Sequence, residues 1–296
     1  MLAPYARTPY AGTPYGSGRR CGEDVVDVLD RARIAERIEA ATVESLVGMM
    51  SAEMAESLGV AVTRLGGGLG VRMAASPGFA FLNRVFAVGL DDPLSADVLD
   101  EAVGFLGAGG GTTLLVQHPP VLETPELLEL LASRGFTRGG TWAKMLRPVG
   151  DPPEAPTDLR IAEVDPAEAD RFGAVQAEGM EMPPFMAPWC ARQVTAAGWH
   201  TYAAYDGDEM VAIGSLFTRG DAGQLSGAAT LPSHRGRGAQ LALMARRIAD
   251  ARDLGVRWIG AETGSETPED PNPSLHNMRR AGMTELYARQ NWLLRR

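Results

Sequence analysis

The chain has 296 residues, with 45% hydrophobic and 22% charged residues and a formal net charge of −9. This composition is typical of a globular protein and argues against a disordered or membrane-spanning class, and the length favours two domains. The negative charge argues against nucleic-acid binding, which depends on lysine and arginine neutralising phosphates, so we expect no nucleic-acid partner and no membrane partner.

The N-terminal segment, residues 1–22, contains Pro-Tyr pairs five residues apart. Such a low-complexity tract cannot bury a core, so we expect a disordered tail. It lacks the apolar stretch of a secretory signal, and we expect a cytoplasmic protein. Cys21 and Cys190 have neither zinc-site nor disulfide spacing, so we expect plain thiols and no metal.

Residues 23–147 are predicted to form a first domain that begins with helical periodicity over 23–58. We expect a break near Ala41 and Thr42 that divides this stretch into two helices. The following elements are expected to be strands 60–65, 69–73 and 79–88, a helix from Ser95, strand 112–117, a helix capped by Thr124, and strand 136–146. The three glycines at 66–68 are interpreted as a hairpin turn, with a phosphate loop as the alternative.

Residues 148–158 include four prolines, which forbid regular structure and indicate a linker. The second domain is therefore predicted at 159–296. Its expected elements are strand 159–164, a helix capped by Asp165, a helical stretch 185–194, strands 199–205, 209–218 and 224–231, helix 238–254, strand 256–262, helix 274–281 and strand 284–294. In helix 238–254 we expect Leu241 and Ile248 to face the core, and Arg246, Arg247 and Arg252 to point outward.

The two halves have the same order of predicted elements, and segments 131–136 and 278–283 are similar. Tandem copies of one fold explain both observations. The first copy has Asp91 and Asp92 where the second copy has two arginines, so we expect an anionic ligand to be repelled there.

The most informative segment lies between strand 224–231 and helix 238–254. It reads Arg235-Gly236-Arg237-Gly238-Ala239-Gln240. A glycine-rich turn that leads into a helix start directs several backbone N–H groups at one point, where the helix dipole adds positive potential. The segment therefore predicts an anion site, with a basic surface turn as the alternative.

On this motif the second half resembles the GNAT superfamily of acyl-CoA-dependent N-acetyltransferases. The family pattern is Arg or Gln, two residues, Gly, one residue, then Gly or Ala, and Gln240 departs from it at the last position. The resemblance is specific over the last half of the chain and topological over the first. It implies an α/β (α+β) fold of two tandem GNAT-like domains, each a mixed, mostly antiparallel sheet flanked by helices, with the first copy degenerate.

The resemblance implies acetyl-CoA as co-substrate, with its pantetheine arm between strands 224–231 and 256–262. The cofactor-binding residues it implies are Ala229, Thr230, Leu231, Arg235, Gly236, Arg237, Gly238, Ala239, Gln240, Ser274 and Asn277. A helix N-cap is the alternative role for Ser274. Met278 stands where the family often has a proton-donating tyrosine, but a thiol can leave as its anion.

Removal of a proton from the acceptor ammonium needs a carboxylate, an imidazole or an ordered water. Glu262 is the candidate catalytic base, because it lies at the carboxyl end of the strand expected beside the thioester. Glu266, Glu178 and Glu181 are weaker alternatives.

The family implies acceptor contacts from the first helices and the last strand of the domain. The candidate substrate-binding residues are Phe185, Trp189, Tyr287, Arg289 and Asn291. Packing between helices is the alternative for the first two. Arg289 and Asn291 alternate on one strand face, which suggests a carboxylate-bearing acceptor.

The function expected from these residues is transfer of an acetyl group from acetyl-CoA to an amine of a small molecule by direct attack. A covalent route through Cys190 is disfavoured, because no activating base is evident near it. A non-catalytic CoA-binding scaffold or sensor and a protein-lysine acetyltransferase are the alternatives. The acceptor, the acyl length and the oligomeric state are left open, with a homodimer as one assembly.

Overall fold

The computed structural model describes residues 23–75, 82–108 and 113–295, so the N-terminal tract expected to be disordered lies outside the described residues. The first half contains α1 (Glu23–Gly48), α2 (Ala52–Ser57), β1 (Val60–Leu65), β2 (Gly68–Met73), β3 (Arg84–Phe86), α3 (Ala96–Gly107), β4 (Thr113–His118), α4 (Pro125–Ser133) and β5 (Thr137–Pro148). The second half contains β6 (Arg160–Glu163), α5 (Ala169–Gly179), α6 (Ala187–Ala191), β7 (Trp199–Asp206), β8 (Glu209–Arg219), β9 (Ala222–Thr230), α7 (Ala239–Asp253), β10 (Trp258–Gly264), α8 (Pro273–Arg280) and β11 (Thr284–Arg295).

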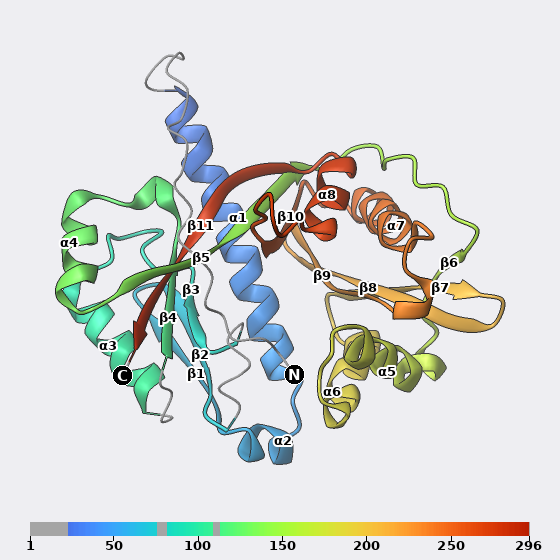
Figure 1. Ribbon diagram of the computed structural model, residues 1–296, viewed down its shortest axis with the longest axis horizontal. Coiled ribbons are helices and arrows are strands. Elements are labelled where there is room, and N and C mark those ends of the chain that lie inside the picture. Colours follow the sequence, from blue (N-terminus) through green and yellow to red (C-terminus); the bar gives the residue numbers. More distant parts are fainter. Residues whose placement is uncertain (1–22, 76–81, 109–112, 296) are drawn as a thin grey trace.

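The strands of both halves form one mixed sheet of eleven strands, in the order β1-β2-β3-β4-β11-β5-β10-β9-β8-β7-β6. Most neighbours are antiparallel, and the parallel pairs are β3–β4 and β9–β10, at equivalent positions of the two halves. Figure 1 shows α3 and α4 beside the first set of strands and α5 to α8 around the second set. The fold is therefore the expected mixed, mostly antiparallel tandem arrangement, but the two copies share one sheet.

The sheet is continuous because the last strands of the two halves lie side by side at its centre. β11 pairs with both β4 and β5, and β5 pairs on its other edge with β10. The strand that ends the first half thus completes the hydrogen bonding of the second half, and the strand that ends the chain completes the first. The domain boundaries stay a prediction, and strand pairing crosses them.

Helix α1 is a single helix of 26 residues that runs across the middle of the molecule (Figure 1), so the break expected at Ala41 and Thr42 is wrong. Thr42 stays in the helix because its hydroxyl donates to the carbonyl of Ile38 at 2.7 Å, and because both residues at the expected break are buried. The helix ends instead before Ser51, whose hydroxyl caps α2. No helix in the described parts of the chain is long and apolar enough to cross a bilayer.

Several local predictions are confirmed. Thr124 caps α4, with Pro125 at the first helical position, and Ser95 caps α3. Gly66 and Gly67 form the two-residue turn of the β1–β2 hairpin with φ of 49° and 77°, as such turns require. The strand expected at 79–88 is shorter, because β3 ends where Ala87 takes a φ of 53°; residues 79–81 lie outside the described part.

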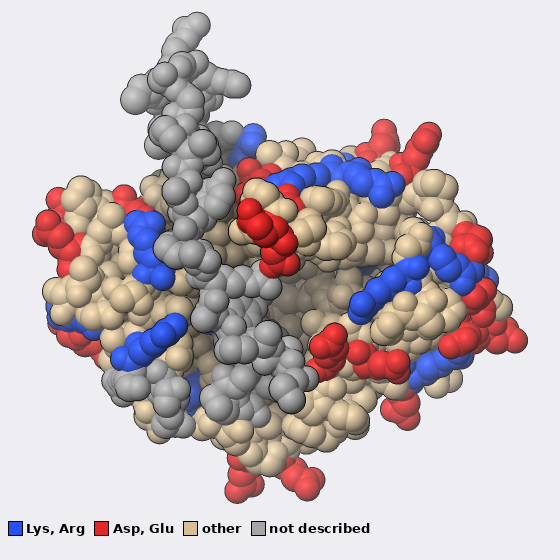
Figure 2. All heavy atoms as spheres, in the orientation of Figure 1, with Lys and Arg blue, Asp and Glu red and all other residues tan. Residues whose placement is uncertain are grey.

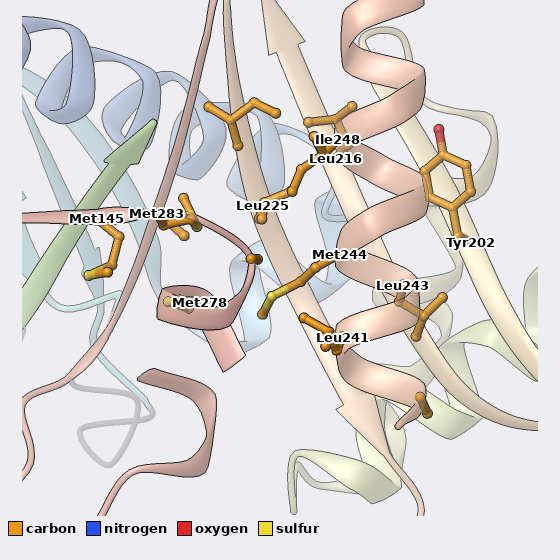
Figure 3. Packing of buried hydrophobic residues seen from close by; sticks show 14 of the residues in the cluster. Met145, Tyr202, Leu216, Leu225, Leu241, Leu243, Met244, Ile248, Met278 and Met283 are labelled. Atoms are coloured by element: carbon orange, nitrogen blue, oxygen red, sulfur yellow. The ribbon is translucent and has the colours of Figure 1, made fainter. Parts of the chain in front are cut away.

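Helix α7 packs its apolar side on strands β8 and β9 (Figure 3). Leu241 and Ile248 face the core as expected, together with Leu243 and Met244. The expectation that Arg247 points outward is wrong, because its side chain is 1% exposed and donates to carbonyls of the sheet. Gly214 makes the room, since a Cβ there would lie 2.8 Å from the Arg247 Cζ.

Candidate functional site

Strands β9 and β10 begin side by side and then separate. Their parallel pairing covers residues 258–260 and 222–224, yet β9 continues to Thr230 and β10 to Gly264. Beyond Gln224 and Gly260 the two strands no longer share hydrogen bonds. The sheet therefore has a gap between the carboxyl ends of β9 and β10, next to the glycine-rich turn that follows β9.

The glycine-rich turn has the backbone conformation that glycine alone adopts without strain. Gly236 and Gly238 have φ of 83° and 80°, and Gly238 is the N-cap of α7. A Cβ at Gly238 would lie 2.6 Å from the Pro156 carbonyl oxygen, so the turn is packed against the segment that joins the halves. The first N–H groups of α7 accordingly have no side-chain cap and are available to an anion.

A pocket of about 610 Å³ lies beside this turn, between the end of β9 and helix α8. Its volume is within the range of small-molecule sites. The lining residues are Gly179, Ile213, Ala228, Ala229, Thr230, His234, Arg235, Gly236, Gly238, Ala239, Gln240, Leu241, Asn272, Pro273, Ser274, Asn277 and Arg280. The pocket thus brings together all but two of the cofactor residues expected from sequence.

The two exceptions are Leu231 and Arg237. The Leu231 amide donates to the Val211 carbonyl at 2.9 Å, within the fold. Arg237 binds Asp206 at 2.6 Å and Asp158 with two nitrogens, and these hydrogen bonds raise its pKa further above the ordinary arginine value. Its charge is therefore compensated by protein carboxylates, whereas Arg235 is exposed and lines the pocket.

Gln240, Ser274 and Asn277 form one hydrogen-bonded group on the pocket wall. The Gln240 amide donates to the Ser274 hydroxyl and accepts from the Asn277 amide, each at 2.7 Å. The N-cap of α8 is Asn272, whose side chain accepts from the Ser274 and Leu275 amides, so the N-cap role considered for Ser274 is wrong. Gln240, the departure from the family pattern, therefore ties the start of α7 to α8.

Sequence reasoning did not assign Arg280 or Asn272 to the pocket. Arg280 adds a cation to the same wall as Arg235. The sequence shows only that Arg280 ends a short helix after the turn. Its position in the pocket depends on how α8 packs on α7, which the sequence does not show. His234 lines the pocket too, with its Nδ1 2.9 Å from the Ser233 hydroxyl and its Nε2 3.4 Å from Asp206.

Glu262 lies on β10 just beyond the last β9 pair, in a buried cluster of charges. Its carboxylate contacts Arg84 at 3.1 Å, Arg289 at 2.5 Å and Lys144 at 3.6 Å. Its side chain remains 12% exposed. Burial raises the pKa of Glu262, and the nearby Glu39 carboxylate raises it further.

The cluster is completed by two carboxylates of α1, Glu36 and Glu39, which also bind Lys144 and Arg289. Although burial opposes ionisation, Arg289 and the other two cations hold the pKa of Glu39 well below its ordinary value. Three acids and three cations from α1, β3, β5, β10 and β11 thus balance each other where the two halves meet.

Four of the five residues expected to bind the acceptor are buried in protein contacts. Tyr287 donates to Glu36 at 2.9 Å, Asn291 accepts from Gln117 at 2.7 Å, and Arg289 belongs to the charge cluster. Trp189 donates to the Leu46 carbonyl at 2.7 Å, which agrees with the packing alternative. Phe185 alone of the five is exposed, at 55%. Arg289 and Asn291 do share a face, but side chains of α1 and Gln117 of β4 occupy it.

In the first half, the side chain of His118 lies where strands β3 and β4 stop pairing. A Cβ on Gly89 would lie 2.8 Å from the His118 Nε2, so this imidazole fills the space. Burial lowers the pKa of His118 to about 4, so the ring is neutral at neutral pH. Asp91 is one of the two acids that stand where the second copy has arginines, and it pairs with Arg37 of α1.

Comparison with known proteins agrees with this geometry. Residues 167–280 match the family described as Acetyltransferase (GNAT) family. No curated protein matches the chain. A GCN5-related N-acetyltransferase from Kribbella flavida is 20% identical over 88% of this chain and 95% of its own, with a TM-score of 0.57.

Two further structures have the same fold. A GCN5-related N-acetyltransferase from Sphaerobacter thermophilus is 16% identical over 80% of this chain and 76% of its own, with a TM-score of 0.56. A tandem GNAT protein from the clavulanic acid biosynthesis pathway is 16% identical over 92% of this chain and 95% of its own, with a TM-score of 0.51. At these identities the likeness concerns the fold.

Residues 167–280 thus match the GNAT acetyltransferase family, and the chain as a whole has a fold similar to that of GNAT proteins, including a tandem one. The match over residues 167–280 supports acyl-CoA-dependent acetyl transfer in general.

Proposed function

We propose that this protein transfers an acetyl group from acetyl-CoA to an amine of a small molecule, by direct attack in a ternary complex. The observation that carries the proposal is the pocket that joins the uncapped start of α7 to the end of β9, the strand that has by then stopped pairing with β10. Its phosphate end has N–H groups, Arg235 and Arg280. Its other end reaches Ala228 of β9, Ile213 of β8 and Gly179 of α5.

The residues present suit coenzyme A. A diphosphate fits the N–H groups of the glycine turn and the positive end of α7. An extended pantetheine arm fits between the two strands beyond Gln224 and Gly260, where they no longer pair with each other. The amine nitrogen then attacks the thioester carbon, the C–N bond forms as the C–S bond breaks, and the electron pair leaves on sulfur.

Glu262 is the base that we propose for the ammonium proton. It lies where β10 separates from β9, part of its side chain is exposed, and burial raises its pKa above the ordinary carboxyl value, which makes it a stronger base. Loss of turnover in Glu262→Gln, with unchanged CoA binding, would support this role. Full turnover in that variant would exclude it.

A covalent acetyl-enzyme on Cys190 is disfavoured. The thiol is fully buried, and burial raises its pKa to about 12, so the reactive thiolate is scarce at neutral pH. Direct attack needs no such nucleophile.

A cationic amine suits the open face of the molecule. Figure 2 shows a hollow between the α5–α6 corner and the segment between β10 and α8, with acidic side chains at its margin. The overall charge of −9 also attracts a cationic acceptor. Exposed Met180 and Phe185, near that corner, would contact an apolar part of the acceptor.

The test is to follow thiol release from acetyl-CoA with a panel of small amines, for the native protein and Arg235→Ala. We expect turnover with at least one amine, and about tenfold weaker CoA binding in the variant, the loss of one charge-assisted contact. Tight CoA binding without turnover on any amine would favour the scaffold, and acetylated lysines on a protein with all small amines inert would favour a protein acetyltransferase. Failure to bind CoA would overturn the proposal. A cytoplasmic location and a homodimer stay predictions.

A further inference from the structure

Arg247 is a buried arginine without an acidic partner among the described residues. Within the described residues it donates hydrogen bonds to backbone carbonyls, those of Leu243 at 2.9 Å, Ser215 at 3.0 Å and Ser226 at 3.5 Å. Its Nη2 is buried and has no partner in the described part of the chain. Burial lowers its pKa to about 10, which still leaves it charged at neutral pH. An uncompensated buried charge is costly, so stability alone does not account for it.

The guanidinium lies against an irregularity of the sheet. Ile213 pairs with Ala229, but the next recorded pair joins Ser215 to Ser226. One residue of β8, Gly214, therefore faces two residues of β9, which is a β-bulge. Arg247 binds the sheet at this bulge, because Ser215 and Ser226 end the regular pairing on one side of it.

The same bulge is fixed from the opposite face of the sheet. Gly227 has a φ of 57°, and a Cβ there would lie 2.7 Å from the Gln176 Nε2. Gln193 donates to Gln176 and accepts from the Ser215 hydroxyl, each at 2.9 Å. Buried side chains thus hold this backbone on both faces, which leaves it little freedom to rearrange.

The bulge is also part of the pocket wall, since Ala228 and Ala229 line the end of the pocket away from the phosphate turn. We propose that Arg247 is a positioning residue for acetyl transfer: it fixes the β9 bulge and places a positive charge behind the peptides that face the thioester carbonyl. This inference rests on the proposed function. The negative charge that develops on the thioester oxygen during attack would then supply the opposite charge that Arg247 lacks in the ground state.

The first experiment measures carbonyl polarisation. Acetyl-CoA labelled with carbon-13 at the carbonyl is bound to the native protein, Arg247→Met and Arg247→Lys, and the carbonyl stretch is recorded by infrared difference spectroscopy. We expect a lower frequency than for free acetyl-CoA in the native protein, a return toward the free value in Arg247→Met, and partial recovery in Arg247→Lys. An unchanged frequency in folded, loaded Arg247→Met would overturn the proposal.

Kinetics provide the second readout. Because Arg247 does not line the pocket, its loss should lower kcat by about 100-fold, the size of one lost electrostatic contribution, with KM for acetyl-CoA within about threefold. Arg246→Met is the matched control, since Arg246 is the preceding residue, is partly exposed and pairs with Asp250. It should change neither quantity. A loss confined to KM in Arg247→Met would count against the positioning role.

A third readout needs no ligand and covers a failure of Arg247→Met to fold. In Gly214→Ala the added Cβ would displace the guanidinium. We expect faster amide hydrogen exchange at Gly227 and Ala228 in this variant and in Arg247→Lys than in the native protein. Native exchange rates at both sites in both variants would overturn the inference. If the native protein binds no acetyl-CoA, the proposed function fails instead, and this exchange measurement still decides whether Arg247 holds the bulge.

Discussion

Arg84 of β3 donates to the Glu262 carboxylate of β10 at 3.1 Å, although 178 residues separate them in the chain. The first half thus holds the side chain that we propose as the base of the second half. Arg84 also donates to Glu39 at 3.1 Å and to Gln117 at 2.6 Å. The first copy is therefore part of the structure that sets the charge around Glu262.

Replacing Arg84 with Met should destabilise the protein strongly. Glu39 and Glu262 would keep their charges in a buried site with one cation fewer, and such a loss costs about 3–5 kcal/mol. Urea unfolding of the two proteins measures the difference. Arg257→Ala, which breaks the exposed pair with Asp221, is the control and should change little. A similarly small loss in the free energy of unfolding in both variants would contradict the view that burial makes the Arg84 charge important for stability.

Stability should fall as the pH is lowered from about 6.5 to about 4, partly because of His118. The folded state holds this ring neutral while the unfolded chain takes up a proton. The free energy of unfolding therefore falls as the pH drops between the two pKa values, and His118 does not change it at higher pH. The contribution between pH 7 and pH 5 is about 2 kcal/mol.

His118→Gln removes this titration and keeps a neutral polar side chain. The free energy of unfolding of the variant, from urea titrations at both pH values, should therefore depend less on pH than that of the native protein. Parallel pH dependence of the two proteins would show that the ring is not held neutral.

Gly236→Ala and Gly238→Ala should differ in their cost. Both positions have a left-handed φ, for which any Cβ costs about 1–2 kcal/mol. A Cβ at Gly236 meets nothing within 4 Å, whereas one at Gly238 would clash with the Pro156 carbonyl. Thermal unfolding should therefore show a clearly larger loss for Gly238→Ala, and equal losses would mean that the Pro156 contact yields freely.

Cys190→Ala should retain turnover within about twofold, because the thiol takes no part in direct attack. In the folded native protein, alkylation of Cys190 should be about a thousandfold slower than in urea, since burial raises its pKa to about 12 and leaves little thiolate. Peptide mapping after iodoacetamide treatment measures both states. An acetylated Cys190 trapped during turnover would reverse this view.

The local elements were predictable from the sequence because local residues determine them. The N-caps Ser95 and Thr124, the Gly66–Gly67 turn and the glycine turn before α7 follow from backbone preferences that act over a few residues. The pocket residues between Ala229 and Gln240, other than Leu231 and Arg237, were expected from the resemblance to the GNAT superfamily that rests on this turn. Their placement as a cofactor site stays a prediction.

The remaining features depend on partners that are distant in the chain. Glu36, Glu39 and Arg289 look like solvated charges, and only the meeting of α1 with β10 and β11 buries them together. The same applies to Arg247, whose room comes from a glycine on another strand. The alternation of apolar and polar residues along β5 and β11 is the same whether each strand pairs within its own half or with the other half, so it does not predict the pairing.

The position of β11 between β4 and β5 has a consequence for synthesis on the ribosome. Until the last residues emerge, β4 presents an open edge, and neither half can close its hydrogen bonding alone. Contacts between such remote segments make folding slow and leave the nascent chain open to aggregation. Separately expressed halves should accordingly be insoluble, and co-expressed halves should recover only by associating with each other.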